Sequence, residues 1–342
     1  MLGEVTDFER PSISRTDQSI RSAPLSRRER TLRVTAALLT RRELARISRS
    51  GKRPKHESAG WGFIAPFLVI FLFVLIAPIV YAIYLSLFQD RLVGGNSFVG
   101  FANFAQVLGD SQFYAGLGRV SLFLVVQVPI MTLAATVAAL AIDSARLLFP
   151  SFFRIFFFLP YAIPSVVAAL MWGFIYGQNF GLVGSLNTFF HGSIPDVLSG
   201  NYILAAIGNI STWEFVGYNM LVLYGALKII PKDLYEAAAI DGASELQIIW
   251  RIKLPAMRGA FVVSIVFSVI GSLQLFAEPS VLRTLAPNSI GSDFTPNLYA
   301  YSLAFAGNEY NYSAAVAIVM GLITMAAAYI VQRVGTRRDA SL

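Results

Sequence analysis

The sequence predicts an all-α polytopic membrane protein with six transmembrane helices. The chain of 342 residues is 56% hydrophobic and 14% charged, whereas about a quarter of the residues of an average soluble domain are charged. About 20 apolar residues span the bilayer core as a helix, and a soluble fold could not bury this many helices that are apolar all round. The chain contains these long runs without Asp, Glu, Lys or Arg: 58–89, 120–142, 155–195, 260–277 and 310–332.

Six spans follow from this pattern. The first is long enough to tilt or project beyond the bilayer, and Pro66 and Pro78 could kink it. The fourth carries one acidic residue, Glu214, near its middle. The last is followed by the basic residue Arg333. In chain order we expect the spans at Trp61–Phe88, Val120–Ile142, Ile155–Tyr176, Tyr202–Ile230, Gly259–Ala277 and Tyr312–Gln332.

The basic residues predict the orientation of these spans. Cytoplasmic loops and ends carry an excess of Lys and Arg. With these spans, 24 of the 27 Lys and Arg residues fall on the side of the two chain ends and only Arg91, Arg119 and Arg283 on the other. We therefore expect both termini and the loop at 231–256 in the cytoplasm; the family resemblance described below implies a bacterial cell, with the spans in its inner or plasma membrane.

The predicted membrane domain covers residues 59–333 and is followed by a short cytoplasmic tail, 334–342. Residues 1–58 are rich in Ser, Arg and Pro at their start, which predicts a basic, disordered tail. They lack the short apolar core of a signal peptide. A basic amphipathic helix at 31–48 on the membrane surface is the alternative. The tail lacks the interleaved aromatic residues typical of nucleic-acid binding.

Composition also limits the chemistry. The chain has no cysteine, which excludes disulfides and thiol chemistry. His56 and His191 are far apart in the sequence and outside the predicted spans. We therefore expect no His-based metal site.

A patterned loop separates the fourth and fifth predicted spans: EAAAIDGASELQIIWRIKLP, Glu236–Pro255. Pro231 suits the first turn of a helix, and Gly242 can adopt the left-handed turn that ends one. Ser244 and Gln247 have the spacing of a capping box, which predicts a second helix. Pro255 is expected to stop that helix. The loop is thus predicted to be a helix–turn–helix elbow.

The second helix of this elbow carries an apolar face, which includes Ile249. Facing only water, that face would remain unburied, so the elbow indicates a protein partner in the cytoplasm.

This loop resembles the EAA loop of ABC importer membrane subunits. The signature positions match at Glu236-Ala237-Ala238, Gly242, Ile252 and Leu254-Pro255. The surroundings, together with FFRIFFFLPYAIPSVVAALMW (152–172), GLVGSLN (181–187) and SLQLFAEPSVL (272–282), resemble maltose-type carbohydrate permeases. The resemblance implies the first-permease role, because the ending TRRDASL differs from the Gly-Ala-Val-Lys-Gly-like C-terminus that the partner permease subunit usually carries.

The resemblance implies the ABC type I importer transmembrane fold and a place in a larger complex. It implies a pair of ATP-binding cassette subunits, a second permease subunit in a heterodimer, and an extracytoplasmic sugar-binding protein. The chain lacks a G-x-x-x-x-G-K-[ST] run. ATP and Mg would therefore bind the partner ATPase, and this chain would be neither an enzyme nor a cofactor binder. The residues that would couple to the ATPase are Glu236, Ala237, Ala238, Asp241, Gly242, Leu246, Trp250, Ile252, Leu254 and Pro255.

The candidate substrate pathway lies on the fourth span and the outer half of the fifth. An ionisable residue within a span, such as Glu214, is a functional candidate, and polar groups beside aromatic rings suit a sugar. The resemblance implies cavity-lining roles for Asn209, Trp213, Phe215, Tyr218, Ser272 and Gln274, to which position adds Glu214 and Glu278. Leu275 departs from the family pattern. In the alternative reading, Glu214 pairs with a neighbouring helix and Trp213 only packs.

Other functions stay open at this point. The importer could serve polyols or glycerol phosphate diesters, although the spans place no Lys or Arg near their middles. A stand-alone secondary transporter would favour inverted repeats, and no convincing internal repeat is apparent. A membrane enzyme would need a catalytic cluster, and the chain lacks Cys and paired His.

Overall fold

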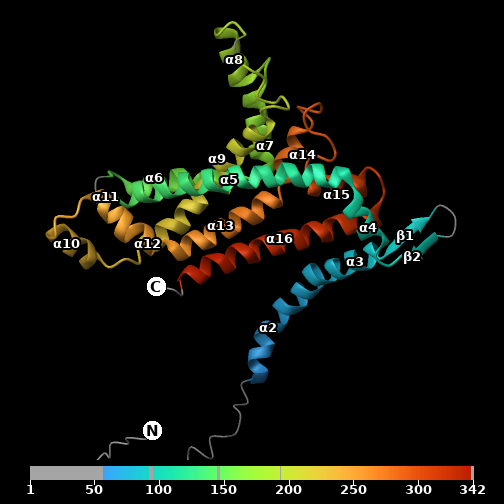
Figure 1. Cartoon of the computed structure of the whole chain (residues 1–342), viewed down its shortest axis with the longest axis horizontal. Helices are drawn as coiled ribbons and strands as arrows, with labels where there is room; N and C mark the ends of the chain where they lie inside the picture. The colour runs from blue at the N-terminus through green and yellow to red at the C-terminus, as the bar shows by residue number, and fades with distance from the viewer. Residues whose placement is uncertain (1–56, 92–94, 145–146, 193, 340–342) are drawn as a thin grey trace, which may run out of the picture. The chain divides into compact units, whose positions relative to one another are not determined.

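The computed structural model describes residues 57–91, 95–144, 147–192 and 194–339, and most of them are helical (Figure 1). The chain divides into two units, Met1–Val74 and Leu75–Leu342. The described part of the first unit contains helix α2 (Glu57–Phe71) and the start of a π-helical stretch, Leu72–Ile76. Apart from its last two residues, the tail predicted at 1–58 lies outside the described residues.

The second unit contains the remaining elements. Its only described strands, β1 (Phe88–Arg91) and β2 (Gly95–Phe98), form an antiparallel hairpin in which Gln89 pairs with Ser97. The α-helices are α3 (Ala77–Ser86), α4 (Ala102–Gly109), α5 (Ser111–Asp143), α6 (Pro150–Phe158), α7 (Ser165–Tyr176), α8 (Gly181–Phe189), α9 (Ile203–Leu227), α10 (Lys232–Ile240), α11 (Glu245–Ile248), α12 (Leu254–Ala256), α13 (Arg258–Leu273), α14 (Ala277–Leu282), α15 (Pro296–Phe305) and α16 (Tyr310–Asp339).

The expected all-α membrane fold is confirmed. Within the described residues, the helical stretches long and apolar enough to cross a membrane are Trp61–Ser86, Ser111–Asp143, Ser165–Phe189, Arg258–Leu282 and Tyr310–Thr336. Helix α9 is less apolar because it carries Asn209, Glu214 and Asn219 among other polar residues. Its 25 residues nevertheless extend for roughly 37 Å at 1.5 Å per residue, enough for a core of about 30 Å. We count α9 as the sixth span.

Two predicted spans are interrupted, which corrects the expectation of continuous helices. The third, expected at Ile155–Tyr176, consists of α6, a 3-10 turn at Leu159–Ala162 and α7. Pro160 and Pro164 lack the backbone N–H that a helix requires, and Ile163, before Pro164, is extended with ψ 130°.

The fifth span, expected at Gly259–Ala277, is also interrupted. It leaves helical geometry after Leu273 and resumes as α14 with Pro279 in its first turn. Proline is tolerated there because the N–H of a first-turn residue has no intrahelical partner.

The span ends also moved. The first helical run stops at Ser86, and Phe88 begins the hairpin. Helix α5 begins at Ser111, nine residues before the predicted start at Val120, so Arg119 lies inside a helix. Helix α16 continues to Asp339, beyond the predicted end at Gln332.

Helix α5 is the central element of the second unit and packs along α9 and α13 (Figure 1). Near its C-terminal end, the buried Ala135 and Ala139 pack in one apolar cluster with Met220 and Leu223 of α9. Small residues on one helix let the other helix approach closely. Gly217 of α9 goes further, since a Cβ there would overlap the carbonyl oxygen of Phe157 in α6.

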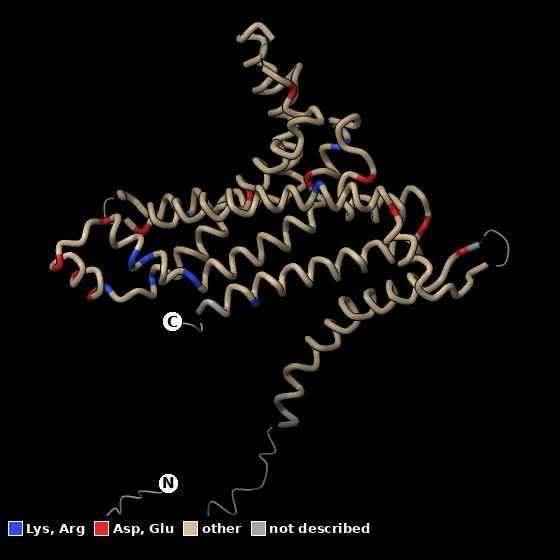
Figure 2. Tube along the Cα trace, in the orientation of Figure 1, with Lys and Arg blue, Asp and Glu red and all other residues tan. Residues whose placement is uncertain are grey.

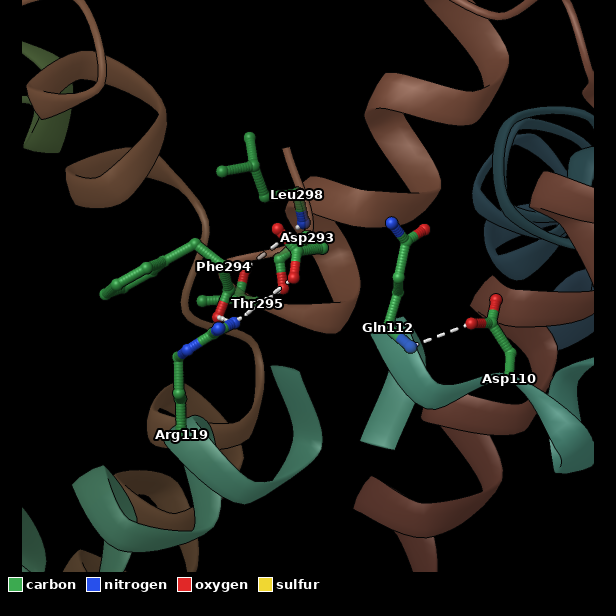
Figure 3. Close-up of polar contacts among 7 residues, drawn as sticks. All are labelled: Asp110, Gln112, Arg119, Asp293, Phe294, Thr295 and Leu298. Atoms are coloured by element: carbon green, nitrogen blue, oxygen red, sulfur yellow. Dashed lines mark hydrogen bonds and ion pairs between the residues drawn. The ribbon is translucent and has the colours of Figure 1, made fainter. Parts of the chain in front are cut away.

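Charged residues hold the N-terminal end of α5. Arg119 extends from α5 to the backbone carbonyls of Asp293 (3.0 Å) and Phe294 (3.4 Å), and its guanidinium lies over the Phe294 ring (Figure 3). Thr295 then caps α15 by accepting a hydrogen bond from the Leu298 N–H (3.2 Å). The long connection before α15 is therefore fixed to α5 at this end.

Asp110 caps the same end of α5. Its carboxylate accepts the Gln112 N–H (2.8 Å; Figure 3) and the hydroxyls of Tyr299 (2.7 Å) and Tyr312 (2.6 Å). Burial alone would raise the pKa of Asp110, but the hydrogen bonds from Tyr312, Tyr299 and the backbone outweigh it and lower the pKa. The carboxylate thus links the starts of α5 and α16 to α15.

Candidate coupling elbow and transport cavity

The elbow predicted between the fourth and fifth spans is formed by α10, a turn and α11. Gly242 takes the left-handed conformation at φ 73°, which glycine adopts without steric cost. The Ser244 Oγ accepts the Gln247 N–H (3.3 Å), and the Gln247 side chain accepts the Ser244 N–H (2.7 Å). The capping box is confirmed, and the first helix begins at Lys232 with Pro231 as its N-cap residue, one position before the first turn in which it was expected.

Pro255 does not end the second elbow helix, which corrects that prediction. After α11 the backbone widens into a π-helical stretch, Ile249–Lys253, and continues through Pro255 in α12. A proline removes one helical hydrogen bond, and the π-helical turn lies directly before it. Met257 separates α12 from α13. The elbow therefore joins the fifth span almost without a break.

The elbow presents an acidic and apolar surface. Leu246 and Trp250 are 64% and 66% exposed, respectively. The predicted coupling residues that are exposed are Glu236, Ala237, Asp241, Gly242, Leu246 and Trp250. Those that are partly buried are Ala238, Ile252, Leu254 and Pro255. The exposed group is therefore the part that a partner could contact.

A charged cluster lies at the base of the elbow. The carboxylate of Asp143, the last residue of α5, pairs with Lys228 Nζ (3.0 Å) and Lys253 Nζ (2.7 Å). The hydrogen bond to Asp143 raises the pKa of Lys228. Burial raises the pKa of the Tyr235 hydroxyl, and the negative charge of Asp143 adds to this shift. Figure 2 shows acidic and basic residues gathered around this end of the second unit.

A cavity of about 470 Å³ opens between α5, α9 and the broken third and fifth spans. It is lined by Phe123, Gln127, Met131, Tyr161, Ser165, Ser211, Phe215, Tyr218, Asn219, Phe267, Ser268, Gly271, Ser272, Gln274, Leu275, Phe276, Ala277 and Glu278. Both helix breaks contribute to it, because Tyr161 lies in the 3-10 turn and Leu275 in the gap before α14. Irregular backbone within a membrane is tolerated where it lines such a cavity.

One wall of the cavity is aromatic. Tyr161 stacks on Tyr218 with ring centroids 5.1 Å apart, and its edge meets Phe215 at 5.9 Å. Phe267 packs edge-on against Tyr218 at 6.3 Å. These rings come from three different segments of the chain, so their flat faces are held in place by the fold.

Other lining residues are polar. Gln127 donates to Thr212 (2.8 Å), and Asn219 accepts from Ser264 (2.5 Å). Glu278 is buried and accepts from Ser211 (3.4 Å). Among the described residues that line the cavity, Glu278 is the only one with an acidic side chain, and none is Lys, Arg or His.

The structure brings five of the eight predicted pathway residues into the cavity: Phe215, Tyr218, Ser272, Gln274 and Glu278. The other three lie around it. Asn209 lines a second hollow of about 540 Å³ between α5 and α9 and donates to the Tyr176 hydroxyl (2.7 Å). Trp213 packs edge-on against Trp172, with centroids 5.8 Å apart. Glu214 is buried behind Ser165, which donates to one of its oxygens.

The sequence missed several residues of both sites. Gln127 is the only residue with an amide side chain in the charge-free run of α5, which was a usable signal. Tyr161 directly follows Pro160, and Ser165 directly follows Pro164; two prolines within one predicted span also indicated a break in the helix. Lys228 and Lys253 served only as basic charges in the topology argument, and Asp143 only ended an uncharged run, because their pairing depends on the fold.

Comparison with known proteins places the chain among transporters. Residues 131–339 match the family model described as the binding-protein-dependent transport system inner membrane component. The probable ABC transporter permease protein YurN of Bacillus subtilis is 30% identical over 77% of this chain and 91% of its own length. The lactose transport system permease protein LacF of Rhizobium radiobacter is 29% identical over 82% of this chain and 95% of its own.

A solved structure has the same fold. It belongs to a bacterial ABC transporter involved in the import of the acidic polysaccharide alginate. The match has a TM-score of 0.73 at 20% identity and covers 84% of this chain and 99% of that one. At this identity the likeness concerns the fold.

Proposed function

The chain belongs to the family of binding-protein-dependent transport system inner membrane components, and from this premise we propose its substrate and its working parts. It is a multi-pass permease subunit of an ABC importer for a sugar. We assign the translocation pathway to the cavity between α5, α9 and the two broken spans. We assign docking of the ATPase subunit to the elbow.

The pairing of aromatic rings with short polar side chains in the cavity carries the sugar assignment. The C–H faces of a sugar ring can stack on Tyr161 and Tyr218, while hydroxyl groups find partners in Ser272 and Gln274. The volume of about 470 Å³ lies within the range of about 300–1,000 Å³ typical of ligand sites. The relative LacF is named for lactose transport.

The charge of the cavity favours an uncharged sugar. A phosphate or carboxylate in a membrane-embedded cavity requires a cationic partner, and the described lining offers only the acidic group of Glu278. Polyols therefore remain compatible with the site, whereas glycerol phosphate diesters are disfavoured. Glu214 lies behind Ser165, where it can hold that hydroxyl toward the cavity.

The proposed complex contains more than this chain. A second permease subunit would complete the pathway as a heterodimer, and an extracytoplasmic binding protein would deliver the sugar. A pair of ATPase subunits would dock on the elbow at the cytoplasmic face, binding ATP and Mg. Glu236 would accept a charge-assisted hydrogen bond from the ATPase, and Leu246 and Trp250 would fill an apolar groove. Both ends of the chain would then lie in the cytoplasm of a bacterial cell.

The cavity assignment can be tested with two aromatic variants in the purified complex. Tyr218→Ala removes a ring that faces the cavity, whereas Trp213→Ala removes one that packs against Trp172 outside it. We expect Tyr218→Ala to lower sugar uptake more than Trp213→Ala when assembly is matched. The quantity to compare is the ratio of sugar uptake between the two variants, measured with radiolabelled sugar. Equal losses would overturn the assignment.

A charge test is independent of these variants. An uncharged oligosaccharide and its uronate counterpart should be compared for uptake through the same complex. We expect uptake of the uncharged sugar only. Efficient uptake of the uronate would contradict the proposed substrate class.

A further inference from the structure

One carboxylate connects the elbow to two of the helices that line the cavity, α5 and α9. Asp143 ends α5, Lys228 follows the last residue of α9, and Lys253 belongs to the π-helical stretch of the elbow. Each carboxylate oxygen meets a different lysine, Oδ1 at 3.0 Å from Lys228 and Oδ2 at 2.7 Å from Lys253. The lysines thus bracket the elbow and meet at one residue outside it.

This cluster is shielded from solvent in its inner half. The side chains of Asp143 and Lys253 are 9% and 13% exposed, whereas that of Lys228 is 56% exposed. Directly before Asp143, Ile142 is buried in the apolar cluster that also contains Leu227. Partly buried ion pairs are screened little by salt, and removal of one partner leaves an uncompensated charge.

The first helix of the elbow joins the same cluster. The Lys253 ammonium lies over the ring of Tyr235 of α10, 5.5 Å from its centroid. The Tyr235 hydroxyl is buried and makes no hydrogen bond among the described residues. Lys228 likewise lies over the ring of Tyr224 at 4.9 Å. Asp143 therefore links the end of α9 through Lys228, and the elbow through Lys253 and the Tyr235 ring beneath it.

From this cluster the helices lead straight to the cavity. Met131, which lines the cavity, precedes Asp143 by three helical turns, or roughly 18 Å of α5. Tyr218 precedes Lys228 on α9 by roughly 15 Å. A helix is stiff over such lengths, so a displacement of the elbow that moves Lys253 would also move the lining residues that α5 and α9 contribute to the cavity.

We propose that Asp143 is the positioning residue that transmits elbow movement to α5 and α9. This inference rests on the proposed function, in which an ATPase subunit moves the elbow. The carboxylate is suited to the task because its two oxygens accept from two ammonium groups at once. An amide could accept through one oxygen only, would turn N–H donors toward the other ammonium group, and would leave both lysines without a counter-charge.

The test uses the assembled complex in liposomes, with sugar uptake and ATP hydrolysis measured together. In Asp143→Asn we expect the number of sugar molecules imported per ATP to fall by about tenfold or more, within the usual range for loss of coupling between sites. Affinity for the ATPase subunit should stay within about twofold of wild type, because the exposed face of the elbow is untouched. Asp143→Glu should restore part of the coupling.

Two further variants make the result decisive. Lys228→Gln removes the more exposed partner of Asp143. Its complex should assemble even if the Asp143→Asn complex fails to assemble, and its ratio of sugar imported to ATP hydrolysed should be lower than that of wild type. Asp90→Asn changes an exposed acidic residue of the β1 strand, outside the elbow, and should leave the ratio unchanged. Wild-type coupling in both Asp143→Asn and Lys228→Gln, or an equal loss in Asp90→Asn, would overturn the inference. A wild-type complex without ATP-driven uptake would instead refute the proposed function.

Discussion

Trp250 is the residue on which the docking of an ATPase subunit can be tested most simply. Its side chain is 66% exposed on the second elbow helix, and the proposal buries it in the partner. Complete burial of a large apolar side chain contributes about 1.5–3 kcal/mol, so burial of the exposed two-thirds contributes about 1–2 kcal/mol. At about 1.4 kcal/mol per factor of ten, Trp250→Ala should weaken docking by roughly 5- to 30-fold.

The affinity should be measured by titrating the co-purifying ATPase subunit onto the permease pair in nanodiscs. Phe98 provides a matched control because it is 68% exposed, but it lies on the β2 strand away from the elbow. Phe98→Ala should leave the affinity unchanged, and Trp250→Phe should retain most of it. An affinity of Trp250→Ala within about twofold of wild type would refute the reasoning, since that much exposed apolar surface cannot be buried without effect.

Three further predictions concern packing, acid stability and charge. Gly217→Ala should lower the thermal midpoint of the purified protein, because overpacking costs about 1–3 kcal/mol. Gly225→Ala is the control, since its added Cβ meets nothing within 4 Å, and should leave the midpoint unchanged. Equal midpoints would contradict the close approach of Gly217 to the Phe157 carbonyl. Hydrogen bonds lower the pKa of Asp110 in the folded protein. The Asp110 carboxylate therefore stabilises the fold at pH values above the unfolded pKa of about 3.9. This stabilisation is lost as the pH falls through the lower pKa of the folded protein. The difference in thermal midpoint between wild type and Tyr312→Phe should therefore shrink below about pH 4, and a constant difference would argue against the carboxylate. Glu236→Lys should weaken ATPase binding and uptake at normal membrane insertion, and normal uptake would remove Glu236 from the interface.

Hydropathy predicted the membrane helices well because lipid contact imposes an apolar composition on whole segments. It placed the end of α5 within one residue of Asp143 but missed nine residues at its start. Arg119 was taken as a boundary, although its guanidinium bonds to backbone carbonyls of a connection far away in sequence. A charge can lie inside a helix wherever tertiary structure provides it with a partner, and that partner is invisible in a sequence window.

The elbow was predictable for a different reason. Its turn and capping box depend on residues close in sequence, so Gly242, Ser244 and Gln247 could be assigned from local rules. Pro255 was misjudged because a wider π-helical turn precedes it. The cavity was predicted in part, since α9 and the end of α13 contribute to it. Its remaining lining comes from α5 and from the break in the third span, which only the fold brings together.

The most direct test is ATP-driven uptake by the complete complex in liposomes. The tagged chain should be purified with its partner subunits, reconstituted with a saturating amount of the binding protein and an uncharged sugar, and supplied with ATP on the elbow side. We predict uptake against a sugar gradient that requires ATP and is lost in Glu236→Lys. Uptake by the purified single chain without ATP would contradict the proposed role as a permease subunit moved by an ATPase.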